Sequence, residues 1–100
     1  MKTSIQEIDG KLVASLSGEL DTAAAAEVEA DLRPLLGSEG RDVVIDCTEL
    51  EYIASSGLRI LLCILKKVKA DGGRVVLKNV NEVIRDVFEL TGFIKLFEFE

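Results

Sequence analysis

The chain has 100 residues, of which 48% are hydrophobic, and its 18 acidic and 12 basic side chains give a net charge of −6 at pH 7. This length predicts one domain over residues 1–100, and the negative charge disfavours binding to nucleic acid or to anionic membranes. Histidine is absent, which excludes Ser-His-Asp and Cys-His catalytic systems and histidine-ligated zinc.

The first predicted element is a hairpin of two strands, over residues 2–8 and 11–18. Asp9-Gly10 between them is a strong turn signal, and the second segment alternates apolar and polar residues. We expect this antiparallel pair at one edge of the sheet.

A helix is predicted next, capped by Asp21 or Thr22, whose side-chain oxygens can accept from the free N–H groups of a first turn. Pro34 should bend or shorten this helix, and Gly37 should end it. The following run at residues 43–45 is apolar without alternation, which predicts a central strand covered on both faces. We expect a loop over residues 47–54.

The second half of the chain repeats the strand and helix pattern. A helix is predicted from Ser55 to Gly72-Gly73, a strand over residues 74–77, a helix capped by Asn79 or Asn81, and a last strand over residues 95–99. The order predicts an α/β fold in which a mixed sheet, antiparallel at first and parallel later, packs against about three helices.

The two cysteines and the apolar segments bear on metal binding and on location. Cys47 and Cys63 lie in apolar surroundings, and two thiols cannot make a four-ligand metal site, so we interpret both as core residues. No apolar run approaches the ~20 residues that span a bilayer. We therefore expect no metal site, no membrane insertion and a cytoplasmic location.

Candidate functional residues follow the second and third strands, because sites in such sheets gather at the carboxyl ends of parallel strands. If these strands are neighbours, Asp21, Asp46, Ser55 and Ser56 converge, and Gly57 allows a close backbone approach. A phosphate on Ser55 would carry about −1.5 to −2 charges and would be repelled by Asp21 or Asp46. Alternatively, Ser55 only caps its helix, and the two aspartates are caps or turn residues.

Four segments carry a resemblance to a known family. They read LSGELD at residues 16–21, VIDCTEL at 44–50, YIASSGL at 52–58 and, after Gly72-Gly73, VIRDVFELTGF at 83–93. In this order they resemble STAS domains, and among these the bacterial anti-sigma factor antagonists. The resemblance covers essentially the whole chain.

The resemblance implies a phosphorylation switch and no catalytic activity or cofactor of its own. In the family, the unphosphorylated protein binds an anti-sigma factor that is a serine kinase and so releases a sigma factor. The kinase phosphorylates a serine, which corresponds to Ser55, and a phosphatase resets the switch. Asp21 corresponds to the family's acidic residue after the second strand. Ala54 stands where the family usually has an acidic residue. We expect Ala54, Asp46, Ser56 and Gly57 to surround the phosphorylation site or to contact the partner.

Three other functions stay open. Ala54 is consistent with a STAS scaffold that binds its partner without phosphorylation, as in stressosome-like assemblies or lipid-transporter subunits. A small enzyme could use Asp21, Asp46 and Ser55, although no histidine is present. Nucleotide binding is disfavoured by the acidic charge and by the lack of a G-x-x-x-x-G-K-(S/T) loop.

Overall fold

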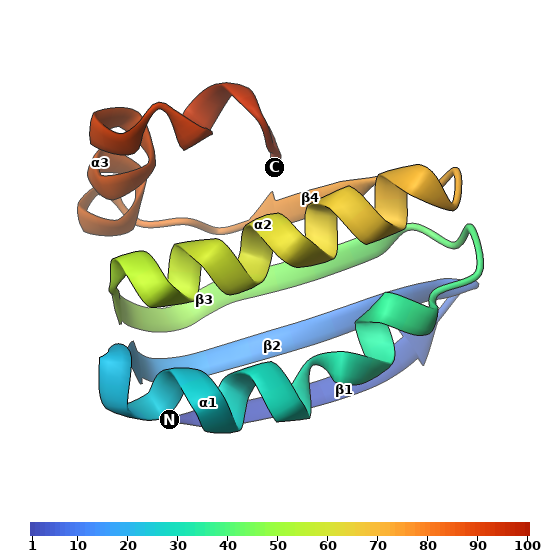
Figure 1. Cartoon of the computed structure of the whole chain (residues 1–100), viewed down its shortest axis with the longest axis horizontal. Helices are drawn as coiled ribbons and strands as arrows, with labels where there is room; N and C mark the ends of the chain where they lie inside the picture. The colour runs from blue at the N-terminus through green and yellow to red at the C-terminus, as the bar shows by residue number, and fades with distance from the viewer.

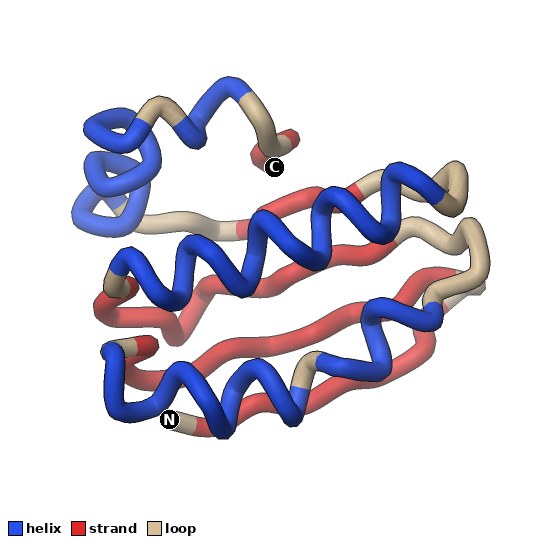
Figure 2. Tube along the Cα trace, in the orientation of Figure 1, coloured by secondary structure: helices blue, strands red, loops and turns tan.

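Strands and helices alternate along the chain in the computed structural model, which describes residues 1–100 (Figures 1 and 2). The elements are β1 (Lys2–Ile8), β2 (Lys11–Leu20), α1 (Thr22–Asp31), the 3-10 helix η1 (Arg33–Gly37), β3 (Val43–Ile53), α2 (Ser55–Ala70), β4 (Val75–Lys78), α3 (Glu82–Thr91), the 3-10 helix η2 (Phe93–Lys95) and β5 (Glu98–Phe99). The predicted mixed α/β fold is confirmed.

The five strands lie in the sheet in the order in which they occur in the chain. β1 is antiparallel to β2, and β2, β3, β4 and β5 are parallel. Each connection between parallel strands therefore leads to the adjacent strand on the same side. Because such connections share one handedness, their helices lie on the same face of the sheet. Figure 1 shows α1 and α2 lying across the same face of the sheet.

The burial of the strands follows from this one-sided arrangement. Ala14, Ile45 and Leu77 point toward the helices and are fully buried. Val13, Val44 and Val76 are paired in register on the other face and are only half-buried. The prediction that residues 43–45 are covered on both faces is therefore wrong.

β3 continues through the segment that was predicted as a loop. Its buried residues are two positions apart as far as Cys47 and three apart at Leu50 and Ile53. The two longer steps coincide with register shifts against β2, where β3 contains an extra residue each time. Such bulges interrupt the alternation of a strand without ending it, which is why the sequence pattern suggested a loop.

The elements that end α1 and follow α3 are shorter than predicted. α1 ends at Asp31, and Pro34 lies in the first positions of η1, so the expected shortening is confirmed.

The predicted strand over residues 95–99 is reduced to β5, because the chain first makes a 3-10 turn. Phe88 of α3 packs edge-on against Phe97 and Phe99, with ring centroids 5.5 and 5.6 Å apart.

The two cysteines differ in exposure. Cys47 is 1% exposed in β3, as predicted, whereas Cys63 on α2 is exposed, so its assignment to the core is wrong. Ile60 and Ile64 face the core from the same apolar run, and a helix turns each successive side chain by about 100°. Cys63 therefore lies outside the buried stripe. None of the helices is long and apolar enough to cross a membrane.

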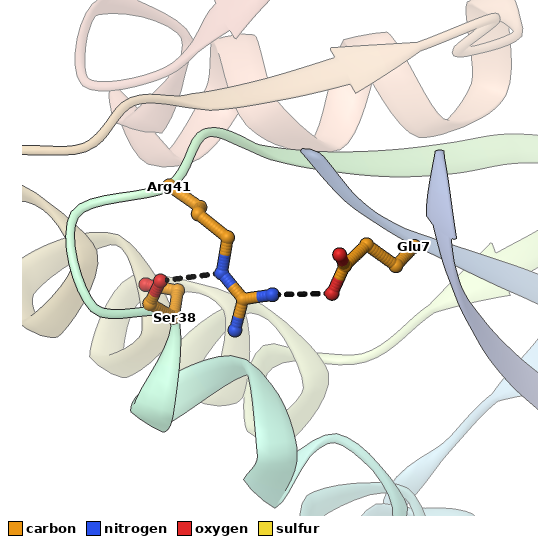
Figure 3. Close-up of polar contacts among 3 residues, drawn as sticks. All are labelled: Glu7, Ser38 and Arg41. Atoms are coloured by element: carbon orange, nitrogen blue, oxygen red, sulfur yellow. Dashed lines mark hydrogen bonds and ion pairs between the residues drawn. The ribbon is translucent and has the colours of Figure 1, made fainter. Parts of the chain in front are cut away.

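Arg41 joins the loop before β3 to the first hairpin. Its Nε donates a hydrogen bond to the Ser38 carbonyl oxygen (2.8 Å), and its Nη1 forms an ion pair with Glu7 (Figure 3). The main chain at Arg41 is also pressed against Gly73. A Cβ on Gly73 would fall on the Arg41 carbonyl oxygen and lie 2.9 Å from Val68 Cγ1.

We predict that Gly73→Ala lowers the free energy of unfolding by about 1–3 kcal/mol, because backbone at Arg41 must move to admit the methyl group. Gly37→Ala is the control, since no atom lies within 4 Å of a Cβ at that position. Urea unfolding followed by circular dichroism measures both. Equal stabilities of the two variants would show that the contact at Gly73 relaxes at no cost.

Candidate functional site

The candidate site lies where β2 and β3 end side by side. Leu20 is paired with Ile53, and the Ala54 N–H donates a hydrogen bond to the Leu20 carbonyl oxygen at 2.8 Å. Asp21 directly follows β2 as the N-cap of α1, and Ser55 begins α2 one residue after Ala54, so both lie at the edge where these two strands end. Figure 1 shows α1 and α2 starting at the same edge of the sheet. The predicted approach of these two residues is confirmed.

Gly57 allows the first turn of α2 to lie directly on the two strand ends. A Cβ at Gly57 would be 2.7 Å from Leu20 Cγ and 3.0 Å from Ile53 Cγ1. Real Cβ atoms do not approach carbon atoms so closely. Any larger residue would force the Leu20 side chain, the Ile53 side chain or the start of α2 to shift, so Gly57 allows the expected close approach.

The two serines that begin α2 have opposite environments. Ala54 is the N-cap and offers no side-chain acceptor, so the alternative that Ser55 caps the helix is wrong. Ser55 is exposed, and its hydroxyl takes part in none of the side-chain hydrogen bonds of the protein. Ser56 is half-buried, and its Oγ is enclosed without a hydrogen-bond partner. Only Ser55 presents its hydroxyl to an approaching protein.

Asp21 is the N-cap of α1. Its Oδ1 accepts a hydrogen bond from the Ala24 N–H at 2.8 Å, which satisfies one of the free donors of the first turn. The residue is half-buried. Asp21 therefore has a structural role, whatever it contributes to binding.

Acidic side chains surround a shallow depression beside the end of β2. Its acidic lining residues are Glu19, Asp21, Glu27 and Glu51, and no lysine or arginine lines it. Sequence reasoning missed Glu27 and Glu51 because they come from α1 and β3. The pairing of Glu19 with Tyr52 brings the strand segments together.

Asp46 lies away from this edge, so the predicted convergence is wrong for this residue. It is in the middle part of β3, paired with Ser15 and Lys78 on the face that lacks α1 and α2. Its Oδ1 accepts hydrogen bonds from the Thr48 hydroxyl and from the Thr48 N–H (3.0 Å). These hydrogen bonds, chiefly that of the hydroxyl, lower the pKa of Asp46. The error has one cause, because β3 runs on to Ile53 instead of ending at Asp46.

The site holds no arrangement suited to a metal ion. No group of three or more cysteine and acidic side chains is placed to ligate one. What the edge presents is an exposed hydroxyl on a rigid helix start, next to a cap and an acidic depression.

This fold and edge define a STAS domain, and the model of the STAS domain family matches residues 2–100. The chain therefore belongs to the STAS domain family. A Bordetella bronchiseptica protein that carries the name anti-sigma factor antagonist BtrV is 38% identical over 97 residues, which is 97% of this chain and 84% of the relative.

Solved structures with the same fold carry related names. An anti-sigma factor antagonist from Mycobacterium paratuberculosis is 31% identical, with a TM-score of 0.83 over 98% of this chain and 83% of that chain. The phosphorylated form of the Bacillus cell fate determinant SpoIIAA is 22% identical, with a TM-score of 0.74 over 99% of this chain and 91% of that chain. The second likeness supports the fold alone.

We predict that Asp21→Ala lowers the free energy of unfolding by about 1 kcal/mol, because the Ala24 N–H loses its acceptor. Asp21→Asn is the matched control, since its side-chain oxygen can still accept and its stability should stay near that of the wild type. Thermal unfolding measures both variants. A fully stable alanine variant would contradict the capping role.

Proposed function

We propose that this protein is an anti-sigma factor antagonist of the cytoplasm that is switched by phosphorylation of Ser55. In the unphosphorylated state it binds an anti-sigma factor that is also a serine kinase, and the sigma factor is released. The kinase then transfers phosphate from ATP to Ser55, and the complex separates. A phosphatase restores the binding state.

The exposed, unbonded hydroxyl of Ser55 is the observation that carries this proposal. It stands on the first residue of α2, next to a serine whose Oγ is enclosed. A kinase must reach the oxygen that it phosphorylates, so the structure favours Ser55 over Ser56. The negative charge of −6 and the lack of a phosphate-binding loop agree with partners that are proteins, and with ATP and Mg²⁺ held by the kinase.

The relatives support the same role. BtrV is named as an anti-sigma factor antagonist and shares 38% of its residues with this chain over most of both lengths. SpoIIAA, which has the same fold, has been solved in a phosphorylated form. Both facts belong to those proteins. The name of BtrV favours the antagonist role for this chain, and the proposed serine switch rests on the exposed hydroxyl of Ser55.

A phosphate on Ser55 would weaken binding for an electrostatic reason. It adds about −1.5 to −2 charges at an edge where Asp21 and the other acidic residues of the depression already lie. A partner that covers Ser55 would have to remove water from this dianion, which costs several kcal/mol unless new cationic partners replace the water. The phosphorylated protein is therefore favoured in the form that is not bound to the partner.

We predict that incubation with the cognate anti-sigma kinase and Mg-ATP adds one phosphate to the wild type and to Ser56→Ala, and none to Ser55→Ala. Intact-protein mass spectrometry measures the gain. The Ser56 variant tests the steric argument, since its hydroxyl is enclosed. An equal gain of mass in Ser55→Ala would show that Ser55 is not the phosphate acceptor.

We predict that Ser55→Glu binds the same kinase at least about tenfold more weakly than the wild type, because a desolvated charge costs more than 1.4 kcal/mol. Ser55→Ala should keep wild-type affinity, since it adds no charge. Titration calorimetry without ATP measures both. If Ser55→Glu bound the kinase as tightly as the wild type, the proposed phosphorylation switch would be contradicted.

A constitutive STAS scaffold is the second candidate, and Ala54 favours it. The N-cap of α2 has no acidic side chain next to Ser55, so one source of repulsion toward a phosphate is missing. This candidate predicts the same partner affinity for Ser55→Glu and wild type. The calorimetric comparison therefore separates the two functions.

A further inference from the structure

A groove separates α1 and η1 from α2, on the side of the helices away from the sheet. Its volume is about 420 Å³, within the roughly 300–1,000 Å³ that small-molecule sites occupy. The apolar part of its lining includes Ala25, Leu32, Leu36, Ile60 and Ile64. The groove is therefore large enough for a small ligand and mostly hydrophobic.

Arginines without carboxylate partners line both walls of this groove. Three of the five arginines in the chain, Arg41, Arg74 and Arg85, form ion pairs. The other two, Arg33 and Arg59, have no carboxylate oxygen within 4.0 Å, and both line the groove. In a chain with a net charge of −6, two unpaired guanidinium groups beside an apolar groove are donors for an anionic ligand.

The polar groups are concentrated at the end of the groove near the start of α2. Thr22, Ser56 and Arg59 lie there, and of their side chains the Arg59 guanidinium is the charged donor. Glu29 lines the middle of the groove, between the levels of Arg59 and Arg33 along the helices. This carboxylate disfavours a ligand with several negative charges, so a single charge at one end fits best.

We propose that the groove binds a small amphipathic carboxylate, such as a medium-chain fatty acid. The carboxylate lies at the end formed by Thr22, Ser56 and Arg59, where the guanidinium donates hydrogen bonds to it. The hydrocarbon chain lies along the apolar lining toward Leu36. The groove is distinct from Ser55, which does not line it, although its polar end begins one residue from that serine.

The two cysteines provide a reporter and its internal control. Cys63 is exposed and lines the groove, so a bound hydrocarbon chain shields its thiol. Cys47 is buried, and this burial, with the nearby Asp46 carboxylate, raises the pKa of its thiol to about 12. Because the thiolate is the reactive form, maleimide labelling of the folded protein reports on Cys63 alone.

The test measures the labelling rate of the full chain with N-ethylmaleimide as decanoate is added below its micelle-forming concentration. We expect decanoate to slow the labelling of Cys63 at least about fivefold at saturation. Decanol, which lacks the charge, should require at least about tenfold higher concentration for the same protection, as expected for the loss of a charge-assisted hydrogen bond. Calorimetric titration of decanoate gives the affinity independently.

Matched arginine variants locate the carboxylate. Arg59→Gln should weaken decanoate binding about tenfold and leave the weak binding of decanol unchanged. Arg74→Gln is the control, because this exposed arginine pairs with Glu98 away from the groove. Equal protection by decanoate and decanol, or an unchanged affinity in Arg59→Gln, would overturn the assignment. If the protein bound phosphatidylglycerol vesicles but decanoate did not protect Cys63, the assignment would be overturned and the groove would instead contact a membrane surface.

Discussion

The order of the strands is the constraint on which the rest of this structure depends. β2, β3, β4 and β5 follow one another in space as they do in sequence, so successive crossovers of one hand leave their helices on the same face. The carboxyl ends of β2 and β3 then meet at one edge, where the hydrogen bond from Ala54 to Leu20 joins them. Ser55 and Asp21 owe their proximity to this arrangement.

Close packing at that edge gives two adjacent serines different environments. Gly57 lets α2 begin directly on Leu20 and Ile53, and this contact fixes the rotation of the helix. With the rotation fixed, Ser55 points to solvent and the Oγ of Ser56 is enclosed.

The groove between α1 and α2 is a second consequence of the one-sided arrangement. Two neighbouring crossover helices on one face leave a furrow between their outer sides, and the small residues of α1 widen it. Its polar end lies beside the first turn of α2, one residue from Ser55. A molecule bound there would contact the helix whose start forms the candidate protein-binding edge. The two surfaces are thus neighbours through a shared helix.

The sequence by itself determined the alternation of strands and helices, the first hairpin, a cap at Asp21 or Thr22 and the position of Ser55 at a helix start, because these follow from local patterns. The tertiary structure decided what depends on neighbouring segments of the same chain. The bulges that extend β3 past Asp46, the bare face at Val44 and the exposure of Cys63 were all predicted differently. The pairing partner, the side of a crossover and the rotation of a helix are not local properties. Residues far apart in the chain, such as Glu27 and Glu51 or Arg33 and Arg59, come together only because strand pairing, crossover side and helix rotation are set by the whole fold.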